Sequence, residues 1–247
     1  MSNTKFISLT LGLAAGISIS IAASQPIQAA DIVYNPPSDI TEWKNANRSR
    51  GVSRGVSRGP SRGVSRGACK SISKDFSLRV LVPGIGNTIS EQPTLYWSIS
   101  QALSAQFELT LKPIMPPGSF DFPEPLIDKT LHLSVNKGIQ ALSLVQHNAK
   151  LDINTQYEWS ISLVCDSENP SINIFDSGTI KRVEPSNFLN GRIKGANERQ
   201  LPYIYAENGV WYDALDTLSR LIQKDDNSLS TVRASLLKQG GLSDVDI

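Results

Sequence analysis

The sequence predicts a mainly β fold, an antiparallel β-sandwich followed by a C-terminal α-helical hairpin. Apolar and polar residues alternate through residues 76–184, and turn-rich segments divide this region into about seven runs. After Gly209 the spacing of apolar residues changes from two to three and four. Period two with one polar face is typical of half-buried antiparallel strands, and about seven short strands in roughly 110 residues is the usual content of a sandwich.

The first 29 residues have the order of a secretory signal peptide. Lys5 precedes an apolar run over residues 6–23, which is followed by Pro26 and by small residues up to Ala30. This order directs export, and we expect cleavage after Ala29 or Ala30. An uncleaved membrane anchor is the alternative, because the run approaches the length that spans a bilayer. The expected location is the periplasm or the cell envelope.

Residues 30–75 predict a disordered basic linker. Five Ser-Arg-Gly copies recur with a period of four in residues 49–67, and residues 44–74 hold nine basic residues and no acidic one. Frequent glycine makes backbone ordering costly, and the few valines cannot offset that cost. From Asp75 onward the chain has 14 basic and 20 acidic residues, so the net charge of +1 conceals a cationic arm on an acidic body.

Because the arm is positively charged, we expect it to bind polyanions weakly through five arginines, namely Arg50, Arg54, Arg58, Arg62 and Arg66. In an exported protein the partner would be an envelope polyanion, such as an acidic wall polymer or lipid headgroups. Two alternatives stay open. The arm is a spacer that binds nothing specific, or it binds single-stranded nucleic acid, which export and the absence of interleaved aromatic residues disfavour.

The strands of the region 76–184 are predicted from local alternation, over residues 77–82, 94–100, 106–111, 130–135, 139–145, 157–165 and 172–183. Residues 83–87 are predicted to be a turn. Trp97 and Trp159 fall on the inward face, whereas Tyr96 falls on the other face. The loop 112–128 holds five prolines together with Phe120 and Phe122. Tyr96, Phe120 and Phe122 are therefore the predicted partner surface.

The segment 151–157 resembles the tyrosine corner of immunoglobulin-like and fibronectin type III domains. Tyr157 opens an alternating strand there, and in such domains the tyrosine hydroxyl bonds back to the chain a few residues upstream. Residues 93–98 are similar to the strand that carries their core tryptophan. The resemblance implies an immunoglobulin/fibronectin-III-like sandwich over 76–184. Cys165 follows Tyr157 by eight residues instead of two, which excludes the inter-sheet bridge of antibody domains.

Cys69 and Cys165 are expected to form a disulfide, because an even pair in an exported protein is typically bridged. The bridge would fasten the end of the arm to the body. Two unrelated buried thiols are the alternative. The chain has two cysteines and two histidines, which are too few for a usual four-ligand zinc cluster. These low numbers also disfavour a catalytic Ser-His or Cys-His pair. We therefore expect no metal and no cofactor.

Residues 185–247 predict a helical segment. One apolar stripe begins at Trp211 and continues to Ile222, and a second runs from Val232 to Leu237 before Gly240 and Gly241 end the helix. Neither helix can bury its apolar face by itself. We therefore expect the two helices, as a hairpin, to pack on the sandwich, and packing on a partner protein is the alternative. Asp213 and Asp216 are neighbours on one helix face, and Glu207 is near in sequence.

As a set, the motifs of the chain resemble the cyanobacterial family called "domain of unknown function 928". They follow an exported Arg-Gly arm and are Leu78-Arg79-Val80-Leu81-Val82-Pro83, Pro93-Thr94-Leu95-Tyr96-Trp97, Gly138-Ile139, Tyr157-Glu158-Trp159, Cys165-Asp166 and Gly209-Val210-Trp211-Tyr212-Asp213-Ala214-Leu215. The resemblance implies an exported, β-rich protein with no assigned activity and no catalytic residues, and it supports the pairing of Cys69 with Cys165.

The expected function is that of a non-enzymatic interaction module of the envelope or periplasm, tethered by its cationic arm to an envelope polyanion or a periplasmic protein. No catalytic constellation is found. The first alternative is a hydrolase that uses paired carboxylates, Asp213 and Asp216 with Glu207 near them. The second alternative is nucleic-acid binding through the arm.

Overall fold

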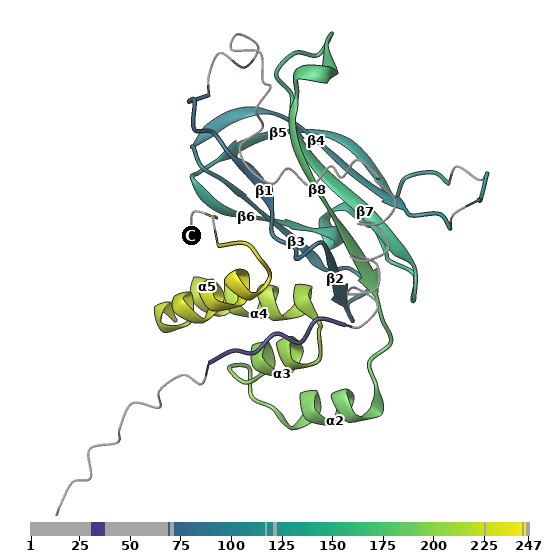
Figure 1. Ribbon diagram of the computed structural model, residues 1–247, viewed down its shortest axis with the longest axis vertical. Coiled ribbons are helices and arrows are strands. Elements are labelled where there is room, and N and C mark those ends of the chain that lie inside the picture. Colours follow the sequence, from purple (N-terminus) through teal and green to yellow (C-terminus); the bar gives the residue numbers. More distant parts are fainter. Residues whose placement is uncertain are drawn as a thin grey trace, which may run out of the picture.

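The computed structural model describes residues 31–37, 69, 72–116, 118–120, 123–224, 226–243 and 245. The predicted signal peptide and the five arginines of the arm lie outside these residues. The described part is mostly β, with two sheets followed by helices near the C-terminus (Figure 1). None of its helices has both the length and the apolar character required to span a bilayer.

The smaller sheet has the strand order β1-β3-β6, and the larger has the order β2-β8-β7-β4-β5. All paired strands are antiparallel except β2 and β8, which are parallel. The strands are β1 Leu78–Val80, β2 Ile85–Thr88, β3 Thr94–Ile99, β4 Leu103–Pro113, β5 Ile127–Val135, β6 Gly138–Ser143, β7 Gln156–Leu163 and β8 Ile174–Arg182.

The inward side chains of both sheets form one core. Trp97 of β3 and Phe107 of β4 are buried there, with ring centroids 5.3 Å apart. Trp159 of β7 is buried in the same cluster, as its alternation predicts. The hydroxyl of Tyr157 donates to the Asp152 carboxylate (3.1 Å) and accepts from the Asp152 backbone nitrogen (3.2 Å), which is the upstream contact expected of a tyrosine corner.

The predicted turn over residues 83–87 is wrong in part, because Ile85–Thr88 forms strand β2. All four of its residues are buried between β8 and the helices, so the strand has no polar face and no alternation to detect. A Cβ on Gly86 would lie 2.6 Å from the Tyr212 ring. Glycine at this position is therefore explained by a close approach of the helical layer, which sequence alone could not indicate.

The helical segment holds four α-helices: α2 Asn187–Gly195, α3 Leu201–Glu207, α4 Trp211–Gln223 and α5 Ser230–Gln239. Helices α4 and α5 lie where the sequence predicts two helices, and their buried residues belong to the core that they share with the sheets. Helices α2 and α3 were not predicted individually. Ser186 caps α2 by accepting from the Leu189 backbone nitrogen at 3.1 Å. Short 3₁₀ turns occur at Leu144–His147, Pro170–Ile172 and Asn227–Leu229.

Residues 31–37, which we call the strap, correct the predicted extent of the linker. The strap lies in extended form along the helices (Figure 1, purple). Its Ile32 and Tyr34 are 2% and 7% exposed and belong to the main core. Alternate residues of this short segment are thus buried, and their burial offsets the entropy of ordering it.

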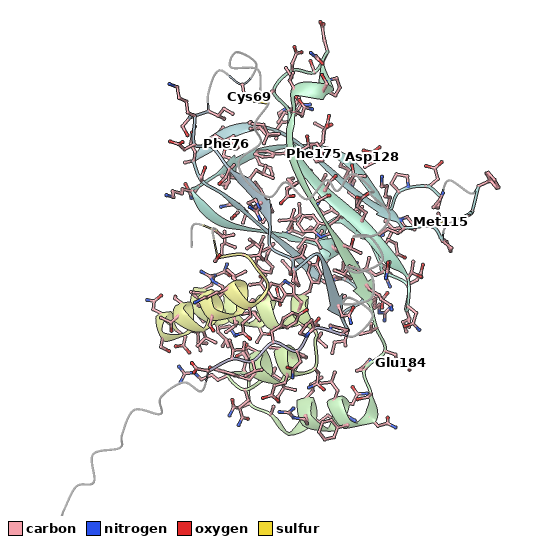
Figure 2. The ribbon with its side chains drawn as sticks, viewed as in Figure 1. Cys69, Phe76, Met115, Asp128, Phe175 and Glu184 are labelled. Atoms are coloured by element: carbon pink, nitrogen blue, oxygen red, sulfur yellow. A yellow bond between two sulfur atoms is a disulfide. The ribbon has the colours of Figure 1, made fainter. Side chains whose placement is uncertain are left out.

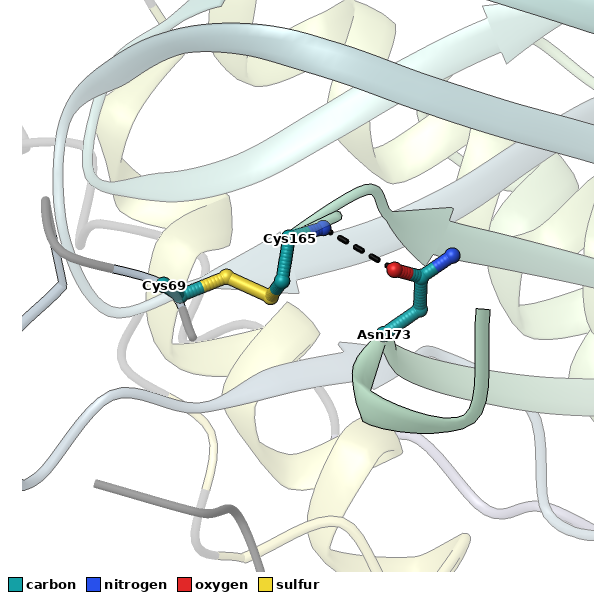
Figure 3. The surroundings of a disulfide bond; sticks show 3 residues. All are labelled: Cys69, Cys165 and Asn173. Atoms are coloured by element: carbon teal, nitrogen blue, oxygen red, sulfur yellow. Dashed lines mark hydrogen bonds between the residues drawn. A yellow bond between two sulfur atoms is a disulfide. The ribbon is translucent and has the colours of Figure 1, made fainter. Parts of the chain in front are cut away.

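The predicted disulfide between Cys69 and Cys165 is confirmed, with 4.7 Å between the Cα atoms (Figure 3). The backbone nitrogen of Cys165 donates to the Asn173 side-chain oxygen at 2.9 Å, which fixes the turn after β7. The bridge joins residues 96 positions apart and ties the end of the arm to the turn that follows β7.

Replacing both cysteines by serine should lower the free energy of unfolding by about 4–5 kcal/mol, because a loop of this size restricts the unfolded chain strongly. Urea unfolding of the oxidised protein and of Cys69→Ser/Cys165→Ser measures the difference. Reducing agent should destabilise the parent and leave the double variant unchanged. Equal stability of the two proteins would contradict a structural role for the bridge.

Candidate functional site

The first turn of α4 joins the helices to both sheets. The indole nitrogen of Trp211 donates to the Leu81 carbonyl at 2.8 Å, directly after β1. The neighbouring Tyr212 hydroxyl accepts from the indole nitrogen of Trp159, in β7, at 2.8 Å, and it lies 3.4 Å from the Thr179 carbonyl. Both aromatic residues are buried. Polar atoms buried at this depth require partners, and here each layer supplies them to the other.

Asp213, the next residue, fastens α4 to the end of β2. One carboxylate oxygen accepts from the Thr88 hydroxyl at 2.8 Å and from the Ile89 backbone nitrogen at 3.2 Å. Burial raises the pKa of Asp213 to about 6, although both hydrogen bonds favour the charged form. The carboxyl group that joins α4 to β2 thus has a pKa well above that of an ordinary aspartate.

Asp216 lies one turn further along α4 and is partly buried. One of its oxygens accepts from the Tyr96 hydroxyl at 3.0 Å, and the other accepts from the Arg220 guanidinium at 2.9 Å. Burial raises the pKa of the Tyr96 hydroxyl, and the nearby carboxylate raises it further. Asp216 is thus committed to an ion pair and to a bond with β3.

Asp213 and Asp216 do line one small cleft of about 140 Å³, between α4 and the segment 90–94. Its other lining side chains include Tyr205, Thr217 and Arg220. Glu207, the third acid of the hydrolase alternative, is directed elsewhere and pairs with Arg192 at 2.7 Å. The cleft has room for a few atoms and falls below the size of usual small-molecule sites.

A larger groove of about 780 Å³ lies on the helical layer, between α2, α3 and the turn Asn227–Leu229. Tyr203, Ile204 and Leu229 give it an apolar floor. Two lining arginines form ion pairs, Arg192 with Glu207 and Arg199 with Asp226. This groove is larger than the cleft beside Asp213 and Asp216, and sequence reasoning missed it because α2 and α3 were not predicted individually.

The predicted partner surface is corrected at Tyr96. This side chain is 3% exposed, because α4 covers the face of β3 that points away from the core between the sheets. Phe120 is 90% exposed, in the loop that projects from the sheets near Met115 (Figure 2). Phe122 lies outside the described residues. Two further phenylalanines are exposed, Phe175 in β8 and Phe188 in α2.

The structure also bears on metal binding. In the ranges that it describes, no three His, Cys, Asp or Glu side chains come together as a ligand set. His132 lies on β5 and His147 in the turn Leu144–His147, on separate elements.

Asp213→Asn tests the buried carboxyl. The amide oxygen can accept both hydrogen bonds, since a single carboxylate oxygen accepts them now. The parent should gain stability relative to the variant as the pH falls through about 6 toward 4, because the folded state binds this proton more tightly than the unfolded chain. The gain should reach at most about 3 kcal/mol.

Urea unfolding at a series of pH values measures this difference. Asp128→Asn, which removes an exposed carboxyl group on β5, is the control and should leave the pH dependence of the parent almost unchanged. A constant difference in stability between the parent and Asp213→Asn at every pH would show that the Asp213 carboxyl is not perturbed by burial.

Comparison with known proteins gives one family and weak structural likenesses. No curated protein matches the chain. A β-glucosidase from Listeria innocua is similar over 44% of this chain and 16% of its own, in complex with glucose (11% identity, TM-score 0.24) and with gluconolactone (10% identity, TM-score 0.24). Likenesses at this TM-score carry no inference. The family model for "Domain of Unknown Function (DUF928)" matches residues 57–247, and the chain therefore belongs to that family.

Proposed function

We propose that the protein is an exported, non-enzymatic interaction module of the cell envelope whose cationic arm binds an envelope polyanion. The separation of charge along the chain carries this proposal. Residues 44–74 have nine basic residues and no acidic one, while the chain from Asp75 onward has 14 basic and 20 acidic residues. Such an arm attracts polyanions that the body repels, so contact is directed to the arm.

Export is supported by two features. The order of charge, apolar run and small residues in the first 30 positions is that of a signal peptide. The Cys69–Cys165 bridge is of the kind that persists in oxidising compartments. A cyanobacterial envelope is the setting we propose.

An immunoglobulin/fibronectin-III-like sandwich is the architecture we propose for residues 76–184. If β1, β3, β4, β5, β6, β7 and β8 are taken as strands A, B, C, C′, E, F and G, the smaller sheet has the order A-B-E. The larger sheet then has the order β2-G-F-C-C′, with β2 as an additional edge strand parallel to G. Strand F then has Tyr157 as its second residue, and the hydroxyl of Tyr157 contacts Asp152. Such sandwiches commonly present loops for recognition, and Phe120 lies on one of these loops.

The hydrolase alternative has less support. Asp213 has a raised pKa and shares a cleft with Asp216, as a general acid would. However, the Asp213 carboxylate already accepts hydrogen bonds from Thr88 and Ile89, and the Asp216 carboxylate accepts them from Tyr96 and Arg220. Both carboxyl groups are thus used to fasten α4 to the sheets, which favours a structural role.

Vesicle binding tests the arm. The mature protein should sediment with vesicles of mixed phosphatidylglycerol and phosphatidylcholine and not with pure phosphatidylcholine. Replacing the five arginines of the Ser-Arg-Gly repeats by glutamine should weaken binding about five-thousandfold at low salt, at about 1 kcal/mol for each charge. Replacing them by lysine should preserve it, because charge and not guanidinium geometry is what the lipid surface attracts.

An isolated acidic wall polymer, used as a second probe, distinguishes lipid headgroups from the wall as the source of the polyanion. The control variant replaces five basic residues of the body, Lys112, Lys129, Lys150, Lys194 and Lys238, by glutamine and should bind as the parent does. Binding that persists in the five-glutamine arm variant, or that does not fall with added salt, would overturn the proposal.

A further inference from the structure

The strap occupies a docking site whose contacts do not depend on which copy of the chain supplies it. We propose that the site also accepts the strap of a second copy, so that neighbouring molecules exchange residues 31–37. The proposal concerns association between copies and is independent of whether the arm binds a polyanion.

The polar contacts make the site specific for an extended segment. The side chain of Gln239, in α5, accepts from the Tyr34 backbone nitrogen at 2.9 Å and donates to the Ile32 carbonyl at 2.7 Å. The Asn35 backbone nitrogen donates to the Ala206 carbonyl at 3.1 Å, and the Asn35 side chain donates to the Glu207 carbonyl at 3.0 Å. Helices α3 and α5 thus bind the strap backbone much as a sheet edge binds an added strand.

The apolar contacts make the site deep. Ile32 and Tyr34 are buried in the main core, and the Tyr34 ring meets the Trp211 ring edge-on, with centroids 4.9 Å apart. Gly209 has φ +71°, and a Cβ there would lie 2.7 Å from the Asn35 carbonyl oxygen. The connection between α3 and α4 is therefore shaped to let the strap pass, and a body without a strap would expose the rings and helix ends that it covers.

The covalent connection permits exchange. Residues 38–68, which are 31 residues, separate the strap from Cys69, where the disulfide fixes the chain to the body. A chain of that length spans at most about 100 Å, and its r.m.s. end-to-end distance as a flexible coil is about 30 Å. Either distance reaches an adjacent molecule. The family match begins at residue 57, so the strap is an addition outside the matched region that nevertheless completes its core.

Effective concentration determines when exchange occurs. A tether of 31 residues keeps its own strap near the site at a millimolar effective concentration. Dilute molecules therefore close on themselves, and molecules held at millimolar density exchange straps into reciprocal dimers or longer chains. The bonds gained in either form are the same, so the choice between them is set by density alone.

The test refolds the mature, disulfide-intact chain from denaturant at micromolar and at millimolar protein concentration, using an equal mixture of tagged and untagged copies. Native mass spectrometry should find monomers at low concentration and mixed dimers at high concentration. Ile32→Asp/Tyr34→Asp should lower the dimer fraction at least about tenfold, because charged groups cannot enter the core site. Val33→Asp is the matched control, since Val33 is exposed in the same strap, and it should dimerise as the parent does.

A synthetic peptide of residues 31–37 supplies a readout that does not rely on the folding of a variant. Added in excess during refolding at millimolar protein concentration, it should suppress the mixed dimers, and the peptide with aspartate in place of Ile32 and Tyr34 should not. Monomers at every concentration, dimers that survive the double substitution, or dimers unaffected by the peptide would each overturn strap exchange.

Discussion

The indole N–H of Trp159 lies in the core between the sheets, and its partner is the hydroxyl of Tyr212 from helix α4. A buried donor that loses its partner costs about 1–3 kcal/mol, so the sheets and the helices are each incomplete without the other. Trp211 and Asp213, on either side of Tyr212, bond Leu81 and Thr88. Three consecutive residues therefore fix one turn of helix against both sheets, and strand β2 is buried because that helix covers it.

The contact between the first turn of α4 and the sheets determines which polar groups and surfaces are left for binding other molecules. Asp213 accepts hydrogen bonds from Thr88 and Ile89, and Asp216 accepts from Tyr96 and Arg220. Both acids therefore take part in contacts that hold α4 on the sheets. The surfaces left for recognition are the groove between α2 and α3, the loop that carries Phe120, and the site that holds the strap. Together with the charged arm, they suit a protein that binds other molecules through several separate regions.

Sequence predicted the features that depend on local pattern or on compartment. Alternation indicated seven of the eight described strands, and the expectation of export indicated the disulfide. Features made by contact between layers were missed. Alternation places Tyr96 on the outer face of its sheet, yet α4 covers that face. All residues of β2 are buried, so its sequence shows no alternation of apolar and polar residues. The strap is too short for the burial of Ile32 and Tyr34 to produce a recognisable pattern. For α2 a signal existed in the cap at Ser186, but the helix is short and only weakly amphipathic.

The central claim is that helices and sheets fold as one cooperative unit through the first turn of α4. Native-state hydrogen exchange of the oxidised mature protein in low urea tests it directly, by measuring the opening free energy of amides in α4, in β7 and in β8. A common opening free energy, with the same dependence on urea, is expected for all three elements. Amides of α4 that open several kcal/mol more easily than those of β7, with a smaller urea dependence, would show that the helical layer is a separate unit and would contradict the claim.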